Sequence, residues 1–133
     1  MSRPVLLVLA ALVASGCATA SGSVSARDAL VGRWTMERVT DGGNDVSATA
    51  NPAGDRFIVL HADGTFESGG RPYGRNTGRW VYNARTRRLG LDSDLGPDDD
   101  STWAVSLRDD TMEWEGVGSA YARRFRITSR RVR

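Results

Sequence analysis

Short runs of alternating apolar and polar residues cover the chain from about residue 30 onward, and clusters of Gly, Asp, Asn and Pro separate them. This period of two predicts β-strands, which we expect at 33–39, 56–60, 65–67 and 77–83, with three hairpins after them. The pattern predicts no amphipathic helix between the strands. About eight short, sequentially connected strands are typical of an up-and-down barrel, in which closure removes the exposed edges. We therefore expect an all-β fold, an antiparallel up-and-down barrel of about eight strands.

Three tight turns join the later strands, and they predict the cross-strand pairs Tyr82–Leu89, Leu107–Met112 and Val117–Ala120. In this register the inward-facing side chains of all three hairpins share one face, whereas a slip of one residue would turn them outward. The same register places Trp114 opposite Arg123 in the last strand. Arg123 then points inward and either stacks on an indole ring or is solvated where the barrel mouth opens. It also places Gly116 opposite Tyr121, whose ring would cover the bare glycine backbone.

The first 16 residues have the pattern of an export signal, with one Arg before an unbroken apolar run that is too short to span a bilayer. Ala14-Ser15-Gly16-Cys17 follows and resembles the bacterial lipobox. That resemblance implies cleavage before Cys17, lipidation of its thiol and, because Ala18 is not Asp, sorting to the outer membrane. The alternative is an ordinary secretory signal with an incidental cysteine.

The expected organisation is a signal peptide at 1–16, a flexible Ala/Ser/Gly/Thr-rich tether at 17–29, the barrel at 30–128 and a basic tail at 129–133. The tail is either solvated or in contact with anionic lipid head groups. We expect the protein in the cell envelope, lipid-anchored in the outer membrane and facing the periplasm.

Charge and cysteine content narrow the function classes. The chain has 18 basic residues, all of them Arg, and 16 acidic residues, and removal of the signal leaves it near neutral. Export and this balance argue against a nucleic-acid partner. The single cysteine excludes an intramolecular disulfide.

Gly32-Arg33-Trp34 opens the first strand, and Arg123 lies in the last one. This pairing resembles the closed end of the lipocalin family. The resemblance implies that Trp34 packs across the barrel base beneath the Arg123 guanidinium, which suits an indole face. It also places the 41–54 loop where lipocalins carry their lid.

Several aromatic residues fall on the expected inner face: Phe66, Trp80, Tyr82, Trp103, Trp114 and Tyr121. Either they line a pocket for a small apolar ligand, or they fill a narrow eight-stranded core. A void above about 300 Å³ would favour the pocket.

The candidate catalytic and metal-binding groups are sparse. His61 is the sole histidine and sits beside an expected turn. The acidic stretch 92–100 fails the EF-hand pattern, because Pro97 and Trp103 stand at its sixth and twelfth positions. We expect no enzyme, no metal and no cofactor.

The sequence thus favours a membrane-anchored lipoprotein whose barrel binds a small hydrophobic ligand. The alternative is a non-enzymatic interaction module, an inhibitor or assembly factor, with a filled core and an envelope protein as its partner.

Overall fold

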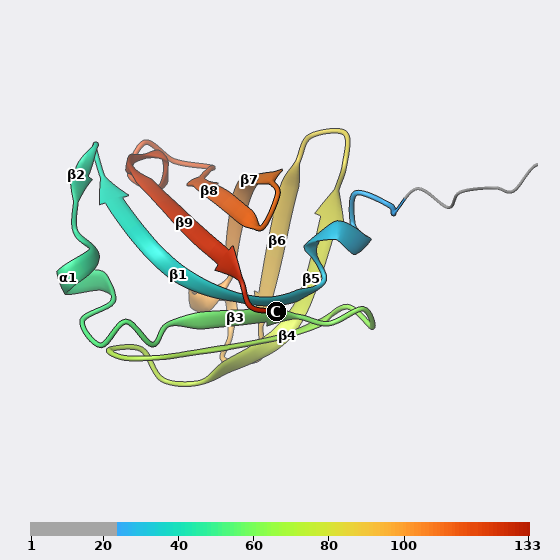
Figure 1. Ribbon diagram of the computed structural model, residues 1–133, viewed down its shortest axis with the longest axis horizontal. Helices are drawn as coiled ribbons and strands as arrows, with labels where there is room; N and C mark the ends of the chain where they lie inside the picture. The colour runs from blue at the N-terminus through green and yellow to red at the C-terminus, as the bar shows by residue number, and fades with distance from the viewer. Residues whose placement is uncertain (1–23) are drawn as a thin grey trace, which may run out of the picture.

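The strands follow one another round a closed ring in this computed structural model, which describes residues 24–133 (Figure 1). Each strand pairs antiparallel with its neighbours, and the last returns to pair with the first. The predicted all-β, eight-stranded antiparallel barrel is therefore confirmed. Its strands are β1 (Gly32–Asp41), β3 (Phe57–Leu60), β4 (Thr65–Gly69), β5 (Asn76–Asn83), β6 (Arg88–Ser93), β7 (Ser101–Arg108), β8 (Thr111–Gly116) and β9 (Phe125–Arg131).

The remaining elements are short and lie at the two ends of the barrel. One end carries the 3₁₀ turn η1 (Asp28–Leu30); the far end of β1 carries β2 (Asn44–Asp45) and α1 (Ser47–Ala50) (Figure 1). The turns η2 (Pro97–Asp99) and η3 (Ala122–Arg124) lie in later loops. Between residues 24 and 133, no helix has the length and apolar character needed to cross a membrane. The expected signal peptide and Cys17 lie outside the described residues.

Two of the three hairpin registers expected from the turns are confirmed. Tyr82 pairs with Leu89 across β5 and β6. Leu107 pairs with Met112 across β7 and β8, which also brings Trp103 opposite Gly116. Both turns are short and rich in Asn, Asp or Arg, so their lengths fix the pairing that follows.

The third hairpin register is wrong. Trp114 pairs with Ile127 in place of Arg123, because residues 117–124 form a longer connection that includes η3. Ser119 organises this connection, since its hydroxyl accepts a hydrogen bond from the Ala122 N–H at 3.0 Å. The main chain of η3, in place of the Tyr121 ring, covers Gly116: a Cβ there would lie 2.1 Å from the Ala122 carbonyl oxygen.

The last strand consequently runs further than expected, to Arg131. Residues 129–131 belong to the barrel and not to a basic tail, and Ser129 is buried. Two basic side chains of the expected tail have partners: Arg130 pairs with Glu37, and Arg133 lies 2.6 Å from the Asp110 carboxylate.

The long connection after β1 is packed against the barrel. The Ser47 hydroxyl accepts a hydrogen bond from the Val39 N–H at 2.9 Å. Asn51 links two segments, because its amide donates to the Met36 carbonyl and its oxygen accepts from the Arg56 N–H. This segment, expected as a lid, is thus anchored to the barrel by hydrogen bonds between its side chains and the main chain.

Candidate functional site

One end of the barrel is filled, and Trp34 is its centre. Trp34 is fully buried, and its indole N–H donates to the Leu30 carbonyl at 2.9 Å. The other fully buried large side chains are Leu30, Leu60, Leu89 and Met112. Burying such a side chain contributes about 1.5–3 kcal/mol. We call this the closed end.

An arginine covers Trp34 at the closed end, but it is Arg131 and not Arg123. The Arg131 guanidinium lies 4.3 Å from the centroid of the Trp34 ring. It donates to the Val31 carbonyl at 2.7 Å and also to the Ala29 carbonyl. Gly32 leaves room for it, because a Cβ on Gly32 would lie 2.8 Å from Arg131 Nη1.

Arg123 itself is exposed in η3, which corrects the expectation that its guanidinium covers Trp34 at the barrel base. Trp114 pairs with Ile127, which lies four residues after Arg123, the partner expected from the sequence. From Ile127 the inward-facing positions of β9 continue through Ser129 to Arg131, which is the arginine that closes the barrel. A shift by an even number of residues leaves the pattern of inward and outward positions unchanged.

Trp80 also belongs to the closed end. Its indole N–H donates to the His61 carbonyl at 2.8 Å, and the Arg27 guanidinium lies 4.2 Å from its ring centroid. His61 therefore contributes its backbone carbonyl to the closed end, and it is an exposed residue. Trp80 fills the core here and lines no cavity at the other end.

The opposite end of the barrel keeps an internal cavity of about 190 Å³. We call this the open end. Trp34 lies at its boundary with the filled half, and exposed Tyr73 and Asp99 mark the mouth. Hydroxyl and amide groups of Ser68, Asn76, Ser101 and Ser129 also line it. The apolar wall consists of Ile58, Phe66, Leu91, Trp103, Trp114 and Ile127.

Three of the six aromatic residues expected to line a pocket therefore do line this cavity: Phe66, Trp103 and Trp114. Tyr82 packs against the core elsewhere, and Tyr121 is 67% exposed on the outside. Trp103 and Trp114 pack edge to face, with ring centroids 6.0 Å apart. Trp103 donates to the Ser101 hydroxyl, whereas the buried Trp114 indole N–H has no partner within residues 24–133.

The mouth of the cavity also carries a half-buried arginine that the sequence pattern did not single out. Arg56 directly precedes β3, where alternation places it on the same face as Ile58 and Leu60. Its guanidinium lies 4.6 Å from the centroid of the Tyr73 ring and donates to the Ala50 carbonyl at 3.0 Å. Burial lowers the pKa of Arg56, although guanidinium stays charged at neutral pH.

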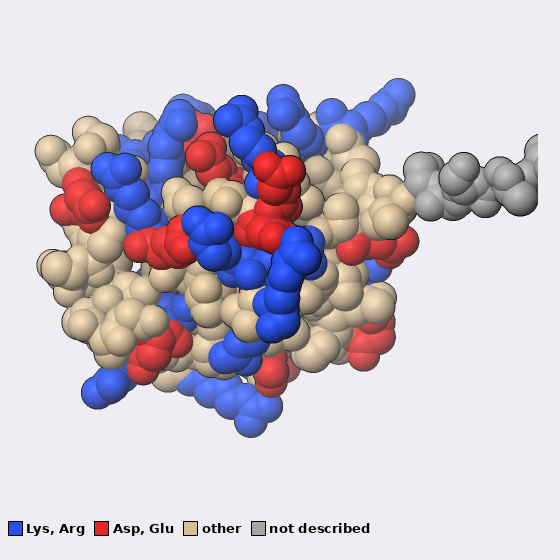
Figure 2. Space-filling model, in the orientation of Figure 1, with Lys and Arg blue, Asp and Glu red and all other residues tan. Residues whose placement is uncertain are grey.

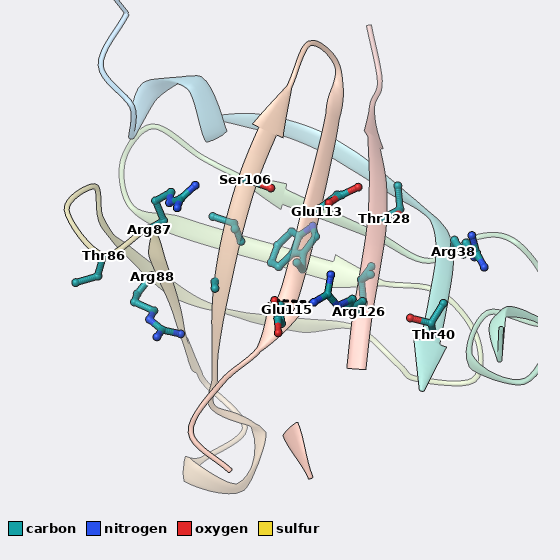
Figure 3. A pocket seen from close by; sticks show the side chains of 14 residues that line it. Arg38, Thr40, Thr86, Arg87, Arg88, Ser106, Glu113, Glu115, Arg126 and Thr128 are labelled. Carbon is teal, nitrogen blue, oxygen red and sulfur yellow. Dashed lines mark ion pairs between the residues drawn. The ribbon is translucent and has the colours of Figure 1, made fainter. Parts of the chain in front are cut away.

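Several grooves lie on the outer surface, and two of them bear on function. One, of about 410 Å³, lies over β7, β8 and β9 and is lined by charges of both signs, including the ion pair of Glu115 and Arg126 at 3.3 Å (Figure 3). The other, of about 910 Å³, runs past exposed Val81 and Tyr121. Basic and acidic side chains are interspersed on the face seen in Figure 2, so no single-sign patch covers that face.

Among residues 24–133, no group of three or more His, Cys, Asp or Glu side chains is placed to hold a metal ion. The acidic side chains of 92–100 serve the loop instead: Asp100 accepts from the Ser93 N–H at 2.7 Å, and Asp94 accepts from the Thr77 hydroxyl at 2.7 Å. Asp63 closes the turn before β4, and hydrogen bonds from Thr65 lower its pKa.

Comparison with known proteins adds evidence on the fold. No family model and no curated protein matches the chain. The structure is similar to the crystal structure of a DUF4847 family protein from Bacteroides vulgatus, with a TM-score of 0.56 and 13% sequence identity, over 76% of this chain and 92% of that protein. At this identity the similarity concerns the fold alone, so function rests on the geometry of the barrel.

Proposed function

We propose that this protein is a non-enzymatic binding protein whose barrel holds a small apolar molecule at the open end. The supporting observation is the asymmetry of the interior. The closed end is filled by fully buried side chains around Trp34. The open end keeps about 190 Å³ beside Phe66, Trp103 and Trp114. Apolar walls with a few polar groups are typical of small-molecule sites.

The cavity volume restricts the size of the ligand. An apolar cavity of about 150 Å³ holds one benzene molecule. Ordinary ligand pockets measure about 300–1,000 Å³. The 190 Å³ found here falls below the void of about 300 Å³ that was expected to favour a ligand pocket over a filled core, so it suits only a single-ring molecule.

We also propose that the chain is exported and works in the cell envelope, anchored in the outer membrane through lipidated Cys17. The support is the lipobox-like Ala14-Ser15-Gly16-Cys17, which lies outside the described residues. Labelled palmitate should enter the wild-type protein and not the Cys17→Ser variant; equal labelling would refute lipidation.

Gly32, Trp34 and Arg131 resemble a lipocalin closed end, so we propose a lipocalin-like relationship as well.

Ligand binding can be tested by NMR on the tryptophan side chains. Toluene titrated into the protein should shift the indole N–H signals of Trp103 and Trp114 saturably, and shift that of Trp80 much less. The reason is that the first two line the cavity and Trp80 does not. Absence of a saturable shift up to the solubility limit would refute the proposal.

A cavity-filling variant provides the matched control. Ser68 lines the cavity, so Ser68→Leu should abolish the toluene shifts by occupying the space. Ser106 is exposed and lines the outer groove over β7, so Ser106→Leu should leave the shifts unchanged. Equal effects of the two variants would contradict binding inside the barrel.

The second candidate function, an interaction module for an envelope protein, is favoured by the outer groove of about 910 Å³. Val81 there is 70% exposed, and Tyr121 is 67% exposed. A photo-crosslinker placed at Val81 should give one discrete adduct in cells, and the same group at exposed His61 should give none. A smear or no product from Val81 would count against this function.

A further inference from the structure

The half-buried Arg56 at the mouth of the cavity has donors to spare. A guanidinium carries five N–H groups, and one of those on Arg56 is used, by the Ala50 carbonyl at 3.0 Å. No carboxylate within residues 24–133 pairs with it. Asp55, its neighbour in sequence, pairs with Arg71 instead.

Several arginines on the outer surface behave differently. They form ion pairs across adjacent strands and loops: Arg38 with Asp45, Arg124 with Asp41, Arg126 with Glu115 and Arg130 with Glu37. The side chains of these four arginines are 55–66% exposed, whereas the Arg56 side chain is half-buried against Tyr73. A half-buried cation without an anionic partner carries part of a desolvation cost, which a bound anion can offset.

The main chain around Arg56 holds it in place. Its N–H donates to the Asn51 side chain at 3.2 Å, and its carbonyl accepts from the Met36 N–H at 3.0 Å. Gly70 packs directly against it, since a Cβ there would lie 2.4 Å from the Arg56 Cα. The guanidinium is therefore presented to the mouth from a fixed backbone, which lowers the entropic cost of binding.

From these observations we propose that the ligand of the open end is a small aromatic or branched aliphatic carboxylate, with its apolar body in the cavity and its carboxylate on Arg56. This inference rests on the proposed function. The planar guanidinium fork matches a carboxylate in a way that a point charge does not. Asp99 also lines the mouth, and its negative charge opposes the ligand. It is exposed, so solvent screens it.

The test compares two probes of similar size, benzoate and benzyl alcohol, by calorimetry and by the Trp103 and Trp114 signals. Wild-type protein should bind benzoate about tenfold more tightly, the effect of one charge-assisted hydrogen bond. Arg56→Gln should remove that advantage and leave benzyl alcohol within about twofold of its wild-type affinity. Arg56→Lys should recover part of it, because the charge remains and the fork is lost.

Two further variants provide the controls. Arg33 stacks on Phe57 at 3.9 Å, much as Arg56 stacks on Tyr73, but it does not line the cavity, so Arg33→Gln should change neither affinity. Asp99→Asn should strengthen benzoate binding, because it removes the opposing charge, and should leave the affinity for benzyl alcohol unchanged. Benzyl alcohol binding equally well or better than benzoate would overturn the carboxylate inference and leave the proposed function standing. Failure of both probes would overturn both.

Discussion

Replacing Gly32 by alanine tests the packing of the closed end. Gly32 has a φ of +140°, a region that L-residues rarely adopt, and a Cβ there would lie 2.8 Å from Arg131 Nη1. The backbone strain alone costs roughly 1–3 kcal/mol. Displacing the guanidinium weakens its hydrogen bond to the Val31 carbonyl, and such charge-assisted bonds contribute about 1.5–3 kcal/mol.

The Arg131 side chain is 25% exposed, so water replaces part of the lost hydrogen bond. The expected total is therefore about 2–4 kcal/mol, a large share of a typical domain stability of about 5–15 kcal/mol. Urea denaturation followed by tryptophan fluorescence measures it, provided that the slope of the transition stays unchanged.

A matched glycine separates strain from crowding. Gly118 has a φ of +104°, and a Cβ added there would meet no atom of a residue beyond its chain neighbours within 4 Å, so Gly118→Ala carries the strain alone. The loss of unfolding free energy should be about 1–2 kcal/mol larger for Gly32→Ala than for Gly118→Ala. This difference should vanish when Arg131 is also replaced by alanine. Equal costs for the two glycines, or an excess that survives the loss of Arg131, would refute the reasoning.

Three further predictions concern stability and use the same urea assay. Trp80→Phe should cost about 1–2 kcal/mol more than Trp114→Phe, because only the Trp80 indole N–H has a hydrogen-bond partner; a reversed order would contradict this. Gly116→Ala should cost several kcal/mol, roughly the upper range for single substitutions, since its Cβ would meet the Ala122 carbonyl at 2.1 Å; a neutral result would contradict the position of η3. Asp63 has a pKa lowered below 3.8 by hydrogen bonds from Thr65, so its stabilisation is present above about pH 4 and is lost as the pH falls through the folded-state value. Asp63→Asn should therefore flatten the decline in stability below about pH 4, and an unchanged decline would rule this contribution out.

The sequence specified the barrel well because period-two alternation and short turns act locally. The turns after Tyr82 and Leu107 have little freedom, so they fix the register of their strands. The connection after Gly116 is longer, and its η3 turn depends on contacts of Ser119 and Ala122 that no alternation pattern encodes. The register of β9 against β8 is shifted by four residues from the expected one. Because four is an even number, the inward-facing positions were predicted correctly although the predicted partner of Trp114 was wrong.

The candidate site was only partly accessible from sequence for a related reason. Alternation identified Phe66, Trp103 and Trp114 as inward, but the volume left between them depends on how closely the strands pack. Arg56 carried a readable signal, since it shares a face with Ile58 and Leu60. That signal was obscured because Phe57 and Val59 make the segment a continuous apolar run, in which inward and outward positions look alike.

Arg131 at the closed end and Arg56 at the open end differ in what surrounds their guanidinium groups. Arg131 donates to two carbonyls and covers Trp34, so its guanidinium serves as part of the wall. Arg56 lines the mouth, lies on Tyr73, an exposed side chain, and donates to one carbonyl of the described residues. The same residue type thus seals a core where backbone acceptors surround it, and is available to a ligand where they do not.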